Sequence, residues 1–219
     1  MRTLFGILFV GMCLVVGTSQ AKADASLCSL VIGNLVGNCG FETGDLTGWT
    51  AMGNDVPGEE GNLYGVEGQD PSDGIDPNSG DFQAYIGDLT TNATTLSQTL
   101  PTLAGGEYFV TFYLAQDTPP GSGQGNTPYI NSIDVTFGGN TLLNTTNVPQ
   151  EGYTKYTFQT AATSNSTVLS IKLGNDLGEF LLDDVSVVVP EPSAWTLMLL
   201  VAGGCVFLLR RKVSHGVAK

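Results

Sequence analysis

The sequence predicts an all-β domain, a β-sandwich, flanked by an N-terminal signal peptide and a single C-terminal transmembrane helix. Three observations lead to this prediction. The middle of the chain contains many short strand-like segments separated by turns rich in Gly, Asn and Thr. It contains no amphipathic helix pattern of three turns or more. Each end of the chain carries an apolar segment that contrasts with the polar body.

Residues 1–23 have the three parts of a secretory signal peptide. Arg2 supplies the positive start, and residues 4–17 form an apolar core too short for a comfortable membrane span. Ala21 and Ala23 are small residues at the two positions that signal peptidase reads. We therefore expect signal peptidase as a processing partner, export across the inner membrane, and a mature body that spans residues 24–189.

The mature body contains two cysteines, Cys28 and Cys39. Export would place them in an oxidising compartment. In an oxidising compartment two cysteines this close together are expected to form a disulfide. Closing a loop of about a dozen residues would stabilise the fold by roughly 3 kcal/mol in the chain-entropy model. The alternative is a pair of free, buried thiols.

The body alternates between apolar and polar residues, as strands do. Residues 107–115 are apolar on both faces, which is typical of a central strand. Residues 131–137 alternate and end at a Gly-Gly-Asn turn, which predicts a hairpin. Further strands are expected at 153–160, 167–173 and 180–189, with Tyr156, Phe158, Leu169, Ile171 and Leu173 facing inward. Residues 53–81 and 119–128 lack strand patterns and are predicted to be long loops.

Charge excludes several classes of function. Between Asp24 and Glu191 the chain has 21 acidic residues and two basic ones, Lys155 and Lys172, a net charge of −19. Such a surface repels nucleic acid and anionic membranes, so no nucleic acid partner is expected. The single histidine, His215, lies in the tail, and this excludes Ser-His-Asp, Cys-His and histidine-zinc chemistry from the body.

The C-terminal tail has three successive parts. Pro190, Glu191 and Pro192 form an extended entry, because proline disfavours helix. Residues 193–209 are apolar and as a helix would span about 26 Å, the lower limit for a hydrocarbon core. A basic stop and a short cytoplasmic tail, residues 213–219, follow. The stop consists of Arg210, Arg211 and Lys212.

This order of parts resembles the PEP-CTERM sorting signal of bacterial exported proteins. The resemblance implies that a membrane protease, exosortase, cuts near the Pro-Glu-Pro motif. It also implies that the protein is anchored in the inner membrane only transiently, and then reaches the cell surface or extracellular matrix. The alternative is an ordinary C-terminal anchor that is never cut.

The start of the body reads NCGFETGDLTGWT, residues 38–50, and its end reads EFLLDDVSV, residues 179–187. Together they resemble jelly-roll domains of the galactose-binding and carbohydrate-binding-module type. The resemblance implies a galactose-binding-domain-like jelly roll, with Trp49 in the core. It also implies a structural Ca²⁺ held by Glu42 and Asp183 together with backbone carbonyls.

The residues themselves are consistent with a cation at that place. Strand alternation would put Asp183 on the inward face with Val185 and Val187. A buried carboxylate needs a partner, and hard oxygen ligands suit calcium. The alternative is a pair of carboxylates that accept hydrogen bonds from backbone N–H groups or water. The acidic residues of the long loop, Asp70, Asp73, Asp76 and Asp81, lack EF-hand spacing and are expected to form a solvated surface.

Sugar recognition would require aromatic rings beside polar groups. The candidate glycan contacts are Tyr64, Tyr85, Tyr113 and Tyr129, with ordinary packing as the alternative for each. We therefore predict a non-enzymatic surface or matrix protein that binds exopolysaccharide or another glycan. The alternatives are a purely structural biofilm or envelope protein without a specific ligand, and a secreted glycoside hydrolase that uses a pair of carboxylates.

Overall fold

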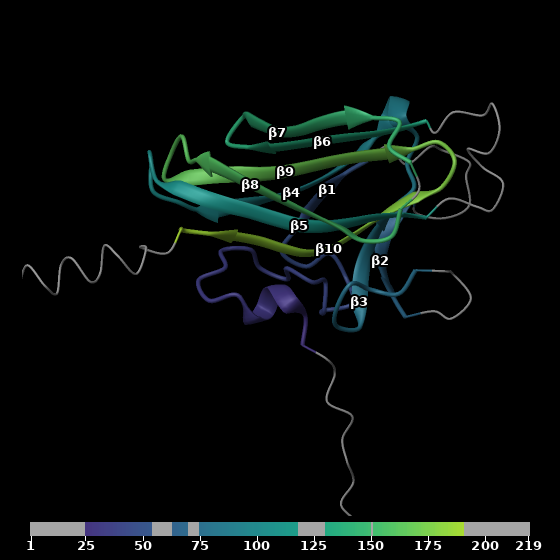
Figure 1. Ribbon diagram of the computed structural model, residues 1–219, viewed down its shortest axis with the longest axis horizontal. Helices are drawn as coiled ribbons and strands as arrows, with labels where there is room; N and C mark the ends of the chain where they lie inside the picture. Colours follow the sequence, from purple (N-terminus) through teal and green to yellow (C-terminus); the bar gives the residue numbers. More distant parts are fainter. Residues whose placement is uncertain (1–24, 54–62, 70–74, 118–129, 150, 191–219) are drawn as a thin grey trace, which may run out of the picture.

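The computed structural model describes residues 25–53, 63–69, 75–117, 130–149 and 151–190 (Figure 1). The predicted signal peptide, Tyr129, Glu191, Pro192, the span 193–209 and the basic stop lie outside these residues. Within the described ranges, no helix is both long enough and apolar enough to cross a membrane.

Two five-stranded antiparallel sheets are stacked face to face (Figure 1). The strand order in the first sheet is β1-β4-β9-β6-β7, and in the second it is β2-β3-β10-β5-β8. The first sheet contains β1 (Thr50–Met52), β4 (Thr94–Pro101), β9 (Ser166–Asn175), β6 (Asn131–Phe137) and β7 (Asn140–Thr146). The second contains β2 (Tyr64–Gly68), β3 (Phe82–Ile86), β10 (Glu179–Val188), β5 (Glu107–Asp117) and β8 (Thr154–Ala161). The all-β sandwich is confirmed.

The core lies between the sheets, and strand alternation fills it as predicted. Leu169, Ile171 and Leu173 of β9 are buried, whereas Val168 and Lys172 on the other face are exposed. In the second sheet, Phe112 of β5 stacks on two partly buried rings of β8 that were expected to face inward. These rings belong to Tyr156 and Phe158, whose centroids lie 5.2 Å and 6.2 Å from that of Phe112.

The prediction that residues 53–81 contain no strand is wrong, because β2 lies within them. All five residues of β2 pair with β3, and two of the five are glycines, Gly65 and Gly68. Glycine has low strand propensity and interrupts the apolar alternation, which explains why the pattern is weak. The strand forms at the edge of the sheet, where its neighbour supplies the hydrogen bonds.

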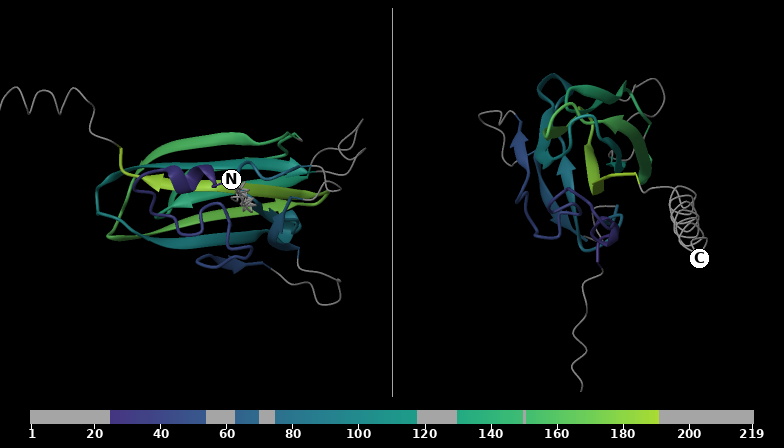
Figure 2. Two further views of the ribbon diagram at one scale, coloured as in Figure 1. Left: turned by 90° about the horizontal axis from the view of Figure 1, so that it is seen from below. Right: turned by 90° about the vertical axis from the view of Figure 1, so that its left-hand side faces the viewer.

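An N-terminal segment, residues 34–39, replaces β3 beside the second half of β10 (Figure 2). β3 pairs only with residues 180–182 of β10. Farther along, Val185 N donates to Cys39 O (2.9 Å) and Leu35 N donates to Val187 O (3.0 Å). The Asn34 side chain also bonds to the backbone of Val185 and Val187. The segment therefore satisfies the strand edge that β3 leaves open.

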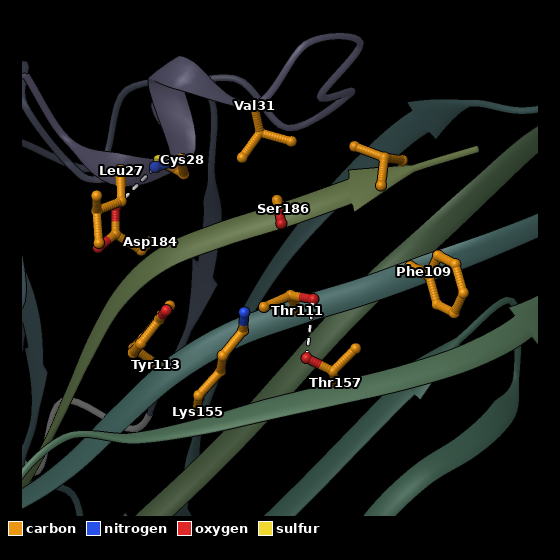
Figure 3. A pocket seen from close by; sticks show the side chains of 11 residues that line it. Leu27, Cys28, Val31, Phe109, Thr111, Tyr113, Lys155, Thr157, Asp184 and Ser186 are labelled. Atoms are coloured by element: carbon orange, nitrogen blue, oxygen red, sulfur yellow. Dashed lines mark hydrogen bonds between the residues drawn. The ribbon is translucent and has the colours of Figure 1, made fainter. Parts of the chain in front are cut away.

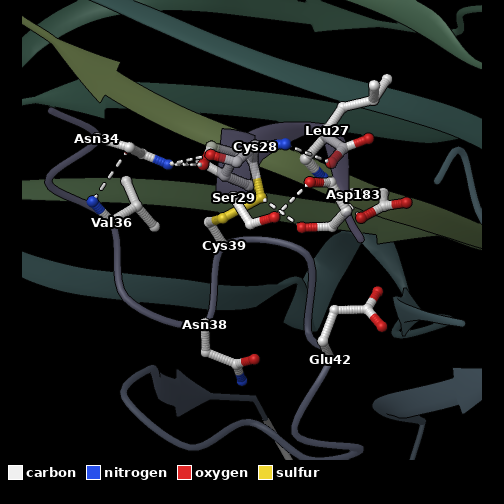
Figure 4. The surroundings of a disulfide bond; sticks show 12 residues. Leu27, Cys28, Ser29, Asn34, Val36, Asn38, Cys39, Glu42 and Asp183 are labelled. Atoms are coloured by element: carbon white, nitrogen blue, oxygen red, sulfur yellow. Dashed lines mark hydrogen bonds between the residues drawn. A yellow bond between two sulfur atoms is a disulfide. The ribbon is translucent and has the colours of Figure 1, made fainter. Parts of the chain in front are cut away.

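The predicted disulfide between Cys28 and Cys39 is present (Figure 4). It joins the short 3-10 helix η1 (Leu27–Leu30) to the segment that runs beside β10. A second 3-10 helix, η2 (Thr90–Asn92), directly precedes β4 in the first sheet. Because that segment is hydrogen-bonded to β10, the disulfide also holds η1 near the second sheet, where the candidate site lies.

Candidate functional site

A β-bulge in β10 places two adjacent aspartates at the centre of the second sheet. The pairing of β10 with β5 shifts register between Asp183 and Ser186, and Asp184 adopts a left-handed φ of 49°. Asp183 and Asp184 are nevertheless 0% and 2% exposed. Such a bulge inserts one extra residue and re-aims the side chains that follow.

The bulge corrects the expected orientation of Asp183. Phe180 and Leu182 face the core before the bulge, and Val185 and Val187 face it afterwards. Asp183 lies opposite Tyr113, whose neighbours along β5 point into the core. Asp183 is therefore buried on the outer face of the sheet and does not share the inward face of Val185. The simple alternation was wrong because the extra residue reverses it.

The two aspartates bind two separate segments of the chain as well as the backbone of β10 itself. Asp183 accepts hydrogen bonds from the backbone N–H of Ser79 (3.1 Å) and of Asp184 (2.6 Å). Asp184 accepts from Cys28 N (2.9 Å), Asn78 Nδ2 (2.7 Å) and Ser79 Oγ (2.6 Å). The bulge thus ties β10 to the N-terminal segment and to the loop before β3.

Glu42 lies in the same region and caps the start of β3. Its carboxylate accepts from the backbone N–H of Asp81 (3.1 Å to Oε2) and of Phe82 (3.4 Å to Oε1). Gly80 has a φ of +73°, and a Cβ on it would lie only 2.0 Å from Glu42 Oε1. Only glycine fits there, because both the backbone conformation and the carboxylate exclude a side chain.

Burial and mutual repulsion raise the pKa values of Asp183 and Glu42. Burial, and then the neighbouring charges of Asp184 and Glu42, raise the pKa of Asp183 to about 8. Burial, with the charges of Asp81 and Asp184, also raises the pKa of Glu42. Each carboxylate therefore lies within electrostatic reach of the others.

The carboxylates suit a hard divalent cation in charge and donor type. In the described part of the chain, no three His, Cys, Asp or Glu side chains are grouped so as to hold a metal by themselves. A cation held by Glu42 and Asp183 would thus need backbone or water oxygens as well. Asp76 and Asp81 of the acidic loop are described, whereas Asp70 and Asp73 lie outside the described residues.

Beside the aspartates, a cavity of about 360 Å³ opens on the outer face of the second sheet (Figure 3). Strands β5, β8 and β10 form its floor, and helix η1 with the residues around it forms one wall. Its lining comprises Leu27, Cys28, Val31, Phe109, Thr111, Tyr113, Lys155, Thr157, Asp184, Ser186 and Val188.

The cavity combines aromatic rings with hydroxyl groups and one cation. Phe109 and Tyr113 come from β5, two positions on either side of Thr111. The hydroxyl of Thr111 lies 3.2 Å from that of Thr157 on β8. Lys155 Nζ lies 5.8 Å from the centroid of the Tyr113 ring. Apolar surface with a few placed polar groups is characteristic of small-molecule sites.

The wall of the cavity depends on the buried aspartates. Cys28 lines the cavity, donates its N–H to Asp184 and is bonded to Cys39. Asp184 lines the cavity as well. The carboxylates and the disulfide together therefore fix the wall against the floor.

Of the predicted glycan contacts, the structure places only Tyr113 in the cavity. Tyr85 lies on the same outer face, across β10 from Tyr113, with its ring over Gly65. Tyr64 is partly buried and packs against the core. Tyr129 lies outside the described residues. Trp49 occupies the expected core position, stacked on Phe41 with 5.7 Å between ring centroids.

Sequence reasoning missed most of the cavity lining. Strand alternation in β5 does place Phe109, Thr111 and Tyr113 on one face, which was the available signal. The burial of that face by the N-terminal segment could not be read from the strand itself. The predicted inward orientation of Tyr156 and Phe158 implies that Lys155 and Thr157 face outward, as they do, but it gave no sign of a ligand site beside them.

No protein-family model matches the chain, and no curated protein matches it. Solved structures do resemble it. TmCBM61, solved in complex with β-1,4-galactotriose, has a TM-score of 0.52 at 18% identity, over 71% of this chain and 98% of that one. The likeness shows that the chain has a jelly-roll sandwich fold.

Two further solved structures resemble the chain more distantly. The K1 cleaved adhesin domain of Lys-gingipain from Porphyromonas gingivalis has a TM-score of 0.47 at 16% identity, over 68% of this chain and 95% of that one. The CBM22-1–GH10 modules of Clostridium thermocellum xylanase 10B, complexed with xylohexaose, have a TM-score of 0.47 at 13% identity, over 74% of this chain and 30% of that one.

The raised pKa of Asp183 predicts a specific pH dependence of stability in the presence of a chelator. Folding favours the protonated form, so this contribution is complete below the ordinary pKa of about 4 and is lost as pH rises through 8. The slope from this one group is at most about 1.4 kcal/mol per pH unit. Asp183→Asn should flatten the decline in unfolding free energy between pH 4 and 8, measured by urea denaturation. Parallel pH profiles for the two proteins would contradict the assignment.

Proposed function

We propose that the chain is an exported, non-enzymatic protein that binds a glycan in the cavity above β5, β8 and β10. The observation that carries this proposal is the cavity itself: two aromatic side chains and several hydroxyl groups share one opening on a jelly-roll sandwich. Its volume of about 360 Å³ lies within the usual range for small-ligand sites, about 300–1,000 Å³.

The chemistry of the lining supports a sugar as the ligand. The C–H face of a pyranose ring is apolar and packs on an aromatic ring, while its hydroxyls need polar partners at the edge. Tyr113 offers the ring, and Thr111, Thr157 and Ser186 offer hydroxyls around it. TmCBM61, which shares the fold, was solved with β-1,4-galactotriose bound, and this supports a saccharide as the ligand class.

A binding role also accounts for the carboxylates better than hydrolysis does. A glycosidase needs one carboxylate as acid and another as nucleophile or base beside the scissile bond. Here Asp183 and Asp184 accept hydrogen bonds from the segments that they hold together. We assign them a structural role.

The proposal includes a structural Ca²⁺ held by Glu42 and Asp183. Three mutually repelling carboxylates, one with a pKa raised to about 8, are stabilised by a divalent cation. The ion would neutralise them and join the N-terminal segment to β10. The ion takes no part in binding the glycan.

The proposal for delivery rests on the tail. The motif Pro190, Glu191 and Pro192, the apolar segment and the basic stop resemble a PEP-CTERM signal. We propose that exosortase removes the tail after insertion in the inner membrane, leaving the sandwich at the cell surface or in the extracellular matrix.

Glycan binding is tested with a glycan array, followed by calorimetric titration of each hit. The full-length chain is purified in a polyoxyethylene detergent, which carries no sugar. Tyr113→Ala should weaken binding about tenfold or more, because a central aromatic contact contributes over 1 kcal/mol. Tyr85→Ala, on the same face but outside the cavity, is the control and should change affinity less than threefold. An array without hits would instead favour a purely structural protein.

Calcium is tested by thermal unfolding. Ca²⁺ at a hundredfold excess over its dissociation constant should stabilise the protein by about 2.7 kcal/mol, or roughly 5–10 °C. Glu42→Gln and Asp183→Asn should abolish this shift. Asp76→Asn, which changes another carboxylate of the acidic loop, should retain it. Equal midpoints of the unsubstituted chain in calcium and in chelator would refute the metal.

Tail removal is tested by the intact mass of the protein recovered from its native host. Cleavage predicts a mature chain that ends near Pro192 and lacks the apolar segment. A chain that still ends at Lys219 would establish an ordinary anchor in its place.

A further inference from the structure

The cavity contains one of the only two basic residues in the body of the chain. Lys155 lies on β8 with an exposed side chain, directly opposite Tyr113 in the sheet. The other, Lys172, lies on β9 in the first sheet. Between Asp24 and Glu191 the net charge is −19, so a lysine in the candidate binding cavity is an unusual local feature.

The ammonium of Lys155 is available to a ligand. Among the described residues Nζ forms no ion pair, and it lies over the Tyr113 ring, 5.8 Å from the ring centroid. Among the described residues that line the cavity, Asp184 is the only carboxylate, and Cys28 N, Asn78 and Ser79 already donate to it. The cavity therefore presents a positive charge that the protein itself leaves without a carboxylate partner.

This charge has little use for a neutral sugar. Aromatic rings and hydroxyl groups are sufficient to bind a neutral pyranose, and both are present without Lys155. An ammonium adds a charge-assisted hydrogen bond when the ligand carries a carboxylate. Nζ now lies over the Tyr113 ring, and the lysine side chain is exposed. A sugar unit that takes its place on the ring would therefore keep its acidic group within reach of the ammonium.

We propose that the cavity selects an acidic sugar, a uronic acid unit within a polysaccharide, with its carboxylate on Lys155 and its ring on Tyr113. This inference rests on the proposed glycan-binding function and specifies its ligand class. The rest of the acidic surface repels such a polymer. Recognition would therefore depend on this single cation.

The test compares polyuronates with the same polymers after chemical reduction of their carboxyl groups. Polygalacturonate, alginate and hyaluronate, each with its carboxyl-reduced form, are titrated against the full-length chain in the polyoxyethylene detergent. At least one polyuronate should bind tenfold or more tightly than its reduced form. The preference should shrink as salt is raised from 20 to 500 mM, because salt screens an exposed ion pair.

Substitutions assign the effect to one side chain. Lys155→Met keeps most of the side-chain volume and should reduce affinity for the polyuronate about tenfold, while affinity for the reduced polymer changes less than twofold. Lys155→Arg should retain the preference. Lys172→Met removes the same charge from the other sheet and should have no effect. The thermal midpoint of each variant, expected within 2 °C of the unsubstituted chain, shows that the fold is intact.

The outcomes separate this inference from the function on which it rests. Tyr113-dependent binding of neutral glycans, with no preference for any polyuronate, would overturn the inference and leave glycan binding in place. An equal loss with Lys155→Met and Lys172→Met would also overturn it, because net charge would then explain the effect. Absence of binding to every glycan would remove the proposed function, and the inference with it.

Discussion

The structure depends on the bulge at Asp183 and Asp184. At this point β10 exchanges one neighbour, β3, for another, the N-terminal segment 34–39. A regular strand could not turn consecutive carboxylates toward both the loop before β3 and the N-terminal segment, because alternate residues face opposite sides. The extra residue and the left-handed backbone of Asp184 solve this problem. The two aspartates then bind Ser79, Asn78 and Cys28, which arrive from distant parts of the sequence.

This arrangement carries an energetic cost that the surrounding residues offset. Adjacent buried carboxylates repel one another and lose hydration, which the raised pKa of Asp183 reflects. Backbone and side-chain donors recover part of this cost, and the Cys28–Cys39 disulfide reduces the entropy lost in ordering the N-terminal segment. Because Leu27, Cys28 and Val31 form the cavity wall, the same interactions that hold the fold also shape the cavity.

Sequence reasoning succeeded where local pattern decides the outcome. Strands β6 and β9 alternate strongly, β5 is a continuous apolar segment, and the two cysteines are close in sequence, so each of these features could be predicted. β2 could not, because its pairing with β3 overrides a glycine-rich sequence. The bulge and the cavity were also missed, since both arise where segments more than a hundred residues apart meet. Asp183 was identified as buried, but the face on which it lies required the three-dimensional register.

The charge distribution of the body determines which ligands the cavity can select. An acidic surface excludes nucleic acids and other polyanions by long-range repulsion, which salt screens over about 8–10 Å. A cation held close to an aromatic ring acts at short range, where geometry matters more than net charge. An acidic polysaccharide would therefore bind only if one of its units fits the ring and reaches Lys155 at once, whereas a polyanion that lacks such a unit would meet only repulsion. The abundance of carboxylates elsewhere in the body thus makes the single lysine in the cavity a source of selectivity.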